Sequence, residues 1–150
     1  MLEATVFDID GTLANLTHRL HYVTGNQKDW GRFFAAIPDD EVIQPLIDLC
    51  RVLLMADEKK VLFVTGRPER TREDTEQWLI KSGLNTDFKD HLFMRKNDDP
   101  RADYLVKRDL LNEMRMAGFE PTLIFDDRQS VVDMWREQGI LVAQVAPNNF

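Results

Sequence analysis

The feature that most constrains the fold of this chain is a regular alternation between short apolar segments and longer segments with helical spacing. The apolar segments have the length of β-strands, and they cover residues 5–9, 61–65, 92–94, 122–125 and 141–145. The helical patterns lie around residues 46–54, 73–82 and 102–116, and a fourth contains Val131, Val132 and Trp135 and ends at Gly139. Such alternation is typical of a parallel sheet with crossover helices. The sequence therefore predicts an α/β fold built on a Rossmann-like, doubly wound parallel sheet.

The size and charge of the chain limit its organisation and its partners. A chain of 150 residues with 43% hydrophobic residues can build one sizeable core, so we expect a single domain over residues 1–150. The formal net charge of −7 disfavours a protein that coats nucleic acid or an anionic membrane, because both need a basic surface. Any contact with nucleic acid should therefore be local.

The cysteine content and the lack of long apolar runs indicate the cellular setting. Cys50 is the only cysteine and sits in an apolar segment, so we expect a buried, inert thiol and no internal disulfide or cysteine metal cluster. The chain opens without a basic leader, and no apolar run approaches the roughly 20 residues that span a bilayer. These features predict a cytoplasmic protein that makes no membrane contact.

The segment from about residue 15 to residue 40 departs from the alternation. It follows the first predicted strand and is far longer than an ordinary loop, for which the median is about 4 to 6 residues. It is rich in aromatic and basic side chains, namely His18, Arg19, His21, Tyr22, Trp30, Phe33 and Phe34. We expect a small lid or cap here, and the alternative is an extra helix that packs its rings on the core. The two histidines lack a third ligand nearby, which disfavours a zinc site.

Two aspartates stand at the end of the first predicted strand. Asp8 and Asp10, with Gly11 and Thr12 after them, follow directly on its apolar residues. Gly11 permits a tight turn, and the alternation of side chains at a strand end can direct both carboxylates into one crevice. Ligands of open α/β sheets bind at the carboxyl ends of the strands. The position of this pair therefore predicts a functional site rather than a solvated turn.

Other elements supply groups that complement these carboxylates. The groups are Thr65, Gly66 and Arg67 after the second strand, Lys107 in the third helix, and Asp126, Asp127 and Arg128 after the fourth strand. Together they provide hard oxygen ligands for Mg²⁺, a hydroxyl donor and a cation for phosphate oxygens. The residues thus indicate chemistry on a phosphate group in the presence of Mg²⁺.

These motifs resemble the four signature motifs of the haloacid dehalogenase superfamily of phosphotransferases, in the order Asp8 to Leu13, Thr65 to Arg67, Lys107, and Asp126 to Arg128. The resemblance implies the fold of that superfamily, with a small cap insertion after the first strand.

A narrower resemblance is to the 3′-phosphatase domain of phage polynucleotide kinase-phosphatase. It is carried by Arg19, residues 64–67, residues 101–103 with Lys107, and residues 125–136. Two departures accompany it. The region from about residue 16 to residue 40 is longer here, which leaves the size of the substrate open. The Gly-x-x-x-x-Gly-Lys-Ser/Thr motif of a kinase is absent from the sequence, which removes ATP-dependent kinase activity.

The resemblance implies a role for each catalytic residue. Asp8 would attack phosphorus and form an aspartyl-phosphate, and Asp10 would protonate the leaving oxygen and later deprotonate water. Thr65 and Lys107 would hold phosphate oxygens. The metal ligands would be Asp8 and the backbone carbonyl of Asp10, and Asp126 and Asp127 would complete the metal shell, either of them directly or through water. The residues expected on the substrate side are Thr12, Arg19, Gly66, Arg67, Asp103 and Arg128, of which Arg128 could instead pair with neighbouring carboxylates.

The leading hypothesis is a Mg²⁺-dependent phosphatase that removes 3′-phosphates from nucleic-acid ends, with a separate polynucleotide kinase or ligase as a candidate partner in the same pathway. A first alternative is a nucleotidase, since one phosphate and a base or two need only a small basic pocket. A second is a receiver-like signalling module, which accepts phosphate on an aspartate without rapid turnover. Asp10 favours an enzyme, because receiver domains lack an acid/base residue at this position.

Overall fold

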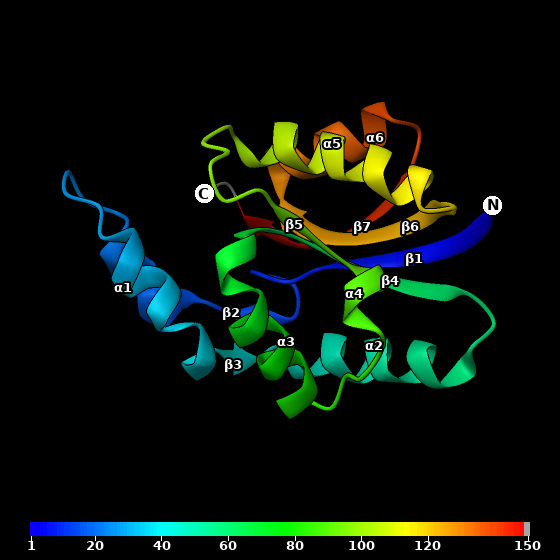
Figure 1. Ribbon diagram of the computed structural model, residues 1–150, viewed down its shortest axis with the longest axis horizontal. Coiled ribbons are helices and arrows are strands. Elements are labelled where there is room, and N and C mark those ends of the chain that lie inside the picture. The colour runs from blue at the N-terminus through cyan, green and yellow to red at the C-terminus, as the bar shows by residue number, and fades with distance from the viewer. Residues whose placement is uncertain (149–150) are drawn as a thin grey trace.

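The computed structural model describes residues 1–148 and centres on a five-stranded sheet in which all neighbouring strands are parallel (Figure 1). The strands are β1 (Leu2–Asp8), β4 (Lys60–Pro68), β5 (Leu92–Arg95), β6 (Phe119–Arg128) and β7 (Leu141–Asn148). Their order is β5-β4-β1-β6-β7, so the chain adds two strands on one side of β1 and then two on the other. The predicted α/β fold is confirmed. Residues 149 and 150 of the expected domain lie outside the described residues, and the extent of the domain stays a prediction.

Helices cover both faces of this sheet (Figure 1). One face carries α2 (Gln44–Ala56), α3 (Arg72–Lys81) and α4 (Phe88–His91), and the other carries α5 (Asp103–Met116) and α6 (Gln129–Glu137). The four predicted helices correspond to α2, α3, α5 and α6. The sequence did not predict α4, because a helix of four residues is too short to show a periodic pattern.

The sheet separates two hydrophobic cores because successive side chains of a strand point to opposite faces. On β1, Val6 belongs to the core under α5 and α6, whereas Phe7 belongs to the core under α2, α3 and α4. Cys50 of α2 is buried in the second core, as predicted, and burial raises the pKa of its thiol to about 12. Trp135 of α6 is buried in the first core.

The segment between β1 and α2 forms several small elements beyond the carboxyl ends of the strands (Figure 1). They are β2 (Ala14–Asn15), the 3₁₀ helix η1 (Thr17–Tyr22), α1 (Trp30–Ala35), the 3₁₀ helix η2 (Ile37–Asp39) and β3 (Glu41–Val42). The antiparallel pair β2 and β3 closes the base of this segment. Phe33 of α1 is buried, whereas Trp30 keeps 47% of its surface exposed. The segment therefore contains an extra helix whose aromatic residues are only partly covered.

Among residues 1–148, no helix is both long enough and apolar enough to span a membrane.

Candidate active site

Three carboxylates converge where β1 and β6 end side by side. Phe7 of β1 pairs with Phe125 of β6, so the next residues of the two strands, Asp8 and Asp126, lie at the same level of the sheet. Asp8, Asp126 and Asp127 are buried, and each offers an oxygen within 4.8 Å of the others. The order of the strands thus brings together acids that are more than a hundred residues apart in the sequence.

Lys107 reaches this cluster from α5. Its Nζ donates to Asp8 Oδ1 at 2.8 Å and to Asp126 Oδ2 at 3.2 Å. Burial favours the neutral amine, but Asp126 and Asp8 outweigh it and raise the pKa of Lys107 above its usual range. The ammonium therefore stays charged in the interior. The indole of Trp135 also donates to Asp126 Oδ2, at 3.0 Å, so a residue predicted only as core also orients a carboxylate of the site.

The turn after β1 holds Asp8 from its other side. Thr12 Oγ1 donates to Asp8 Oδ2 at 3.1 Å, so the two oxygens of this carboxylate have different donors and its plane is set. Gly11 makes the turn possible, because its φ of +86° suits glycine and a Cβ there would overlap the carboxylate of Asp127. Thr12 is fully buried against Asp8.

The charge balance around Asp8 is unfavourable without a further cation. Burial and the neighbouring Asp126 raise the pKa of Asp8 well above its usual range, and Lys107 offsets this only in part. Burial likewise raises the pKa of Asp127. Three carboxylates without histidine or cysteine form a hard oxygen site of the kind that suits Mg²⁺. The donor set therefore fits the predicted metal.

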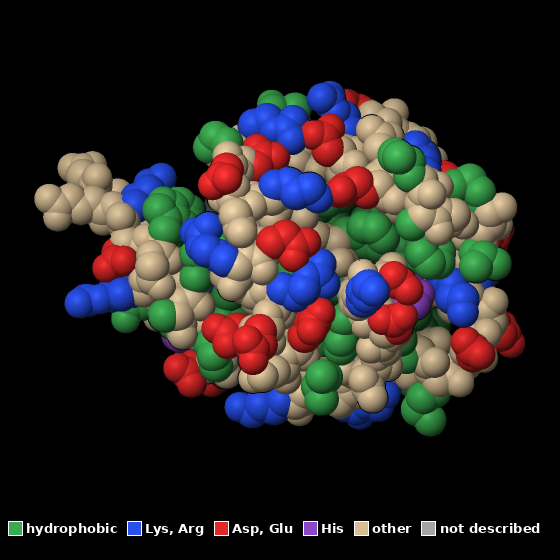
Figure 2. Space-filling model, viewed as in Figure 1, with side chains coloured by type: hydrophobic (Ala, Val, Ile, Leu, Met, Phe, Trp, Pro, Cys, Tyr) green, Lys and Arg blue, Asp and Glu red, His purple; other side chains and the backbone are tan. Residues whose placement is uncertain are grey.

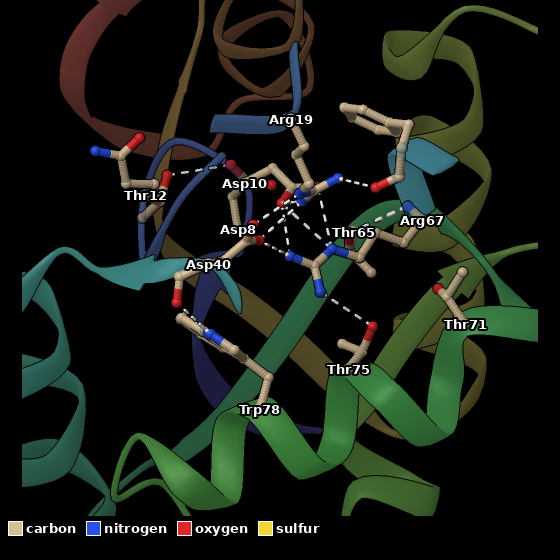
Figure 3. Close-up of polar contacts among 12 residues, drawn as sticks. Asp8, Asp10, Thr12, Arg19, Asp40, Thr65, Arg67, Thr71, Thr75 and Trp78 are labelled. Carbon is tan, nitrogen blue, oxygen red and sulfur yellow. Dashed lines mark hydrogen bonds and ion pairs between the residues drawn. The ribbon is translucent and has the colours of Figure 1, made fainter. Parts of the chain in front are cut away.

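Two arginines donate hydrogen bonds to the carboxylate of Asp10 (Figure 3). Arg67 binds it in bidentate fashion, with Nη2 donating to Oδ1 at 2.7 Å and Nε to Oδ2 at 3.1 Å. Arg19 Nη2 donates to Oδ1 at 2.9 Å. Burial by itself would raise the pKa of Asp10, but Arg67 and Arg19 together lower it below its usual value. The carboxylate is therefore ionised and held in one orientation.

A fourth charged residue, which was not predicted from the sequence, completes this cluster. Asp40 is buried after η2 and accepts from Arg19 Nε at 2.8 Å, from Arg67 Nη2 at 3.1 Å and from His18 Nε2 at 2.6 Å. The indole of Trp78 donates to its carbonyl oxygen at 2.9 Å (Figure 3). The sequence held one clue: two arginines expected at the site need carboxylate partners. It could not select Asp40 among 26 acidic residues.

The carboxyl end of β4 approaches the start of α5. Thr65 is buried, and its hydroxyl accepts from the backbone N–H of Arg67 at 3.1 Å. A Cβ on Gly66 would overlap the carboxylate of Asp103, so this contact needs glycine. Asp103 accepts from Arg95 Nη2 at 2.6 Å and from Arg128 Nη1 at 2.8 Å.

These groups surround one pocket of about 620 Å³, which lies in the range of about 300 to 1,000 Å³ typical of ligand sites. The predicted residues that line it are Asp8, Asp10, Gly66, Arg67, Asp103, Lys107, Asp127 and Arg128. The remaining predicted residues are buried against this lining: Thr12 on Asp8, Arg19 on Asp10, Thr65 on Arg67 and Asp126 on Lys107. The structure thus brings all of the predicted residues together, and their roles in binding and catalysis stay predictions.

Comparisons with known proteins agree on one family. A family model described as the polynucleotide kinase PNKP phosphatase domain matches residues 2–150. A protein described as a putative bifunctional polynucleotide kinase/RNA ligase, from Autographa californica nuclear polyhedrosis virus, is 31% identical over 137 residues, which is 91% of this chain and 18% of the viral protein. The chain therefore spans less than a fifth of this relative.

Solved structures show the same relation. Chains from two structures described as the Pnkp1/Rnl/Hen1 complex and the Pnkp1/Rnl/Hen1 RNA repair complex superpose with TM-scores of 0.80 and 0.82 at 29% identity. They cover all of this chain, which spans 47% and 44% of theirs. A class C acid phosphatase from Bacillus anthracis shares the fold, with a TM-score of 0.64 at 17% identity over 92% of this chain and 61% of its own.

Asp40 generates a prediction about stability. Asp40→Asn should lower the free energy of unfolding by about 3 to 5 kcal/mol, because removing one partner of a buried ion pair leaves the other charges uncompensated. Asp39→Asn is the matched control, since its exposed neighbouring carboxylate should contribute within about 0.5 kcal/mol. Urea denaturation at neutral pH measures both. Equal stabilities of the two variants would show that Asp40 does not hold the arginines in place.

Proposed function

Because the chain belongs to the family of polynucleotide kinase PNKP phosphatase domains, we propose that it is a phosphatase that removes 3′-phosphates from nucleic-acid ends. The observation that carries the proposal is the pairing of two aspartates in one pocket. Asp8 is held by Lys107 among carboxylates, whereas Asp10, two residues later, is held by Arg67 and Arg19. Two acids in opposite electrostatic surroundings suit two different roles, one as nucleophile and one as acid and base.

In the proposed reaction Asp8 supplies the nucleophile. One of its carboxylate oxygens attacks phosphorus, and the bond from phosphorus to the leaving oxygen breaks, which gives an aspartyl-phosphate. Lys107 and Thr12 hold Asp8 in one plane for this attack. Water then attacks phosphorus, releases inorganic phosphate and restores Asp8.

Asp10 would move the protons of both steps. It gives a proton to the leaving oxygen in the first step and takes one from the attacking water in the second. Without substrate, the two arginines favour its ionised form. A phosphate dianion in the pocket would share Arg67, which lines the pocket, and add a nearby negative charge, and both effects raise the pKa of a carboxylic acid. Substrate binding would thus prepare Asp10 as an acid.

A magnesium ion fits the remaining carboxylates. Asp8, Asp126 and Asp127 would hold it, with the backbone carbonyl of Asp10, because the Asp10 carboxylate is engaged by the arginines. When bound, Mg²⁺ would neutralise the charge of these carboxylates and of the phosphate.

The names of the similar proteins suggest a setting for this activity. They combine polynucleotide kinase with RNA ligase or describe an RNA repair complex. We propose that a kinase or a ligase acts in the same end-healing pathway, since the removal of a 3′-phosphate leaves the 3′-hydroxyl that a ligase needs.

A comparison of substrates tests the proposed function. With Mg²⁺, the protein should show its highest kcat/KM on a 3′-phosphorylated oligonucleotide, compared with a 5′-phosphorylated oligonucleotide and a panel of mononucleotides. A preference for mononucleotides would support a nucleotidase instead. Phosphorylation of the protein without release of inorganic phosphate would exclude both enzymes.

The two aspartates predict a difference between leaving groups. Asp8→Asn should abolish phosphate release from every ester, because an amide cannot act as the nucleophile. Asp10→Asn should lose at least about 100-fold more activity on a 3′-phosphorylated oligonucleotide than on nitrophenyl phosphate, whose leaving group needs no proton. Thermal unfolding checks that both variants are folded. Equal losses on the two esters would contradict an acid/base role for Asp10.

Metal removal provides another prediction. Dialysis against a chelator should abolish activity, and added Mg²⁺ should restore it, because the carboxylates around Asp8 need a cation. Asp127→Asn should raise the Mg²⁺ concentration needed for half of the maximal rate, whereas Asp133→Asn on the exposed side of α6 should not. Full activity in excess chelator would contradict the proposed metal site.

A further inference from the structure

One wall of the pocket consists of aromatic rings that the proposed chemistry does not use. Trp30 and Phe34 of α1 line the pocket, and their ring centroids lie 5.8 Å apart with an interplanar angle of 27°. Phe33 is buried and packs edge-on against Trp30, with the ring centroids 5.6 Å apart. Trp30 is thus supported by a buried ring and keeps 47% of its surface exposed. A flat, supported and partly exposed ring offers a stacking surface.

Most cationic side chains that line the pocket are already paired with aspartates. The paired ones are Arg67 with Asp10, Arg95 and Arg128 with Asp103, Arg101 with Asp99, and Lys107 with Asp8. Lys28 and Arg70 also line the pocket, but neither forms an ion pair with any residue in the range 1–148. They can therefore bind an anionic ligand without breaking an existing ion pair.

These two cations lie against the aromatic wall. The Arg70 guanidinium is 5.2 Å from the centroid of Phe34, and Lys28 Nζ is 5.9 Å from the centroid of Trp30. Arg70 belongs to the 3₁₀ helix η3 (Glu69–Thr71) after β4, and its backbone N–H donates to Asn97 Oδ1 at 2.7 Å. Its main chain is therefore tethered to the body of the domain, and only the side chain extends toward α1.

Outside the pocket, the surface carries charges of both signs. Figure 2 shows basic and acidic side chains interspersed over the face in view, with basic and hydrophobic side chains together in the region of α1. In a protein of net charge −7, long-range attraction of a nucleic acid is weak. Recognition must come from contacts within the pocket.

We propose that Trp30, Arg70 and Lys28 form a subsite for the nucleoside that carries the 3′-phosphate and for the phosphate on its 5′ side. Trp30 stacks on the base, and Arg70 with Lys28 binds the 5′-side phosphate while the 3′-phosphate lies at Asp8. Arginine suits this role because its planar fork matches phosphate oxygens. The inference rests on the proposed function, and it assigns substrate recognition to the segment between β1 and α2 together with η3.

A pair of substrates that differ by one phosphate tests the role of Arg70. The protein should prefer a nucleoside 3′,5′-bisphosphate to the nucleoside 3′-phosphate, and Arg70→Ala should remove this preference. On a 3′-phosphorylated oligonucleotide Arg70→Ala should lower kcat/KM by about 10- to 150-fold, as expected for loss of a charged hydrogen bond, and leave nitrophenyl phosphate hydrolysis unchanged. Arg32→Ala on α1 is the control, since Arg32 is exposed and does not line the pocket.

The salt dependence gives a readout that a structural role would not change. Each phosphate contact to a single strand contributes about 0.7 to the slope of log(kcat/KM) against log[KCl]. At fixed Mg²⁺, Arg70→Ala should reduce this slope by that amount on the oligonucleotide, and Arg32→Ala should not. Arg70→Glu, which adds repulsion, should lose more activity than Arg70→Ala on the oligonucleotide alone.

Trp30→Ala tests the stacking surface. It should lower kcat/KM by about 5- to 150-fold on the nucleoside 3′-phosphate and on the oligonucleotide alike, but not on nitrophenyl phosphate. Losses of equal size on all three substrates, or no loss for Arg70→Ala and Trp30→Ala, would overturn the subsite. If the unaltered protein fails to prefer 3′-phosphorylated ends, the proposed function fails before any variant is compared, so the two failures are distinguishable.

Discussion

The burial of charge at the carboxyl end of the sheet is the constraint on which the rest of this structure depends. Five carboxylates, those of Asp8, Asp10, Asp40, Asp126 and Asp127, face the three cations Arg19, Arg67 and Lys107. Charges of this kind are tolerated in an interior only when they are paired and hydrogen-bonded. The carboxylates outnumber these cations by two, which favours the binding of a further cation among Asp8, Asp126 and Asp127.

The surrounding elements provide hydrogen-bond partners for these charged side chains. The described residues contain no buried side-chain nitrogen or oxygen without a hydrogen-bond partner. Trp78 and Trp135 pack in the two separate cores, and their indoles donate to the backbone carbonyl of Asp40 and to the carboxylate of Asp126, respectively. Packing on each face of the sheet therefore also orients the charges at its end. A core substitution at either tryptophan would disturb the site as well as the fold.

The segment between β1 and α2 contributes to two different parts of the pocket. Its buried part supplies Arg19 and Asp40, which hold Asp10 through direct and shared ion pairs. Its exposed part supplies Trp30, which faces the pocket without touching these charges. The same segment thus helps to position Asp10, the proposed general acid, and also provides an aromatic surface on which a nucleobase can stack.

How much the sequence predicts differs between the fold and the site. The alternation of apolar and helical segments was enough for the α/β fold, since residue periodicity is a local property. Asp8, Asp10, Lys107 and Asp126 could be named as candidates because the motifs that contain them resemble those of a known family. Asp40 could not, because its partners lie 21 and 27 residues away from it along the chain and no short motif contains them.

The sequence by itself determined the five strands of the central sheet and the helices α2, α3, α5 and α6, the family to which the chain belongs and the acids gathered at the strand ends. Only the tertiary structure decided which cation pairs with which carboxylate. It placed Lys107 on Asp8, Arg19 and Arg67 on Asp10, and left Lys28 and Arg70 without a carboxylate among the described residues. The physical reason is that ion pairing depends on distances of a few ångströms between side chains from different elements, and the order of the strands and the packing of the helices set those distances.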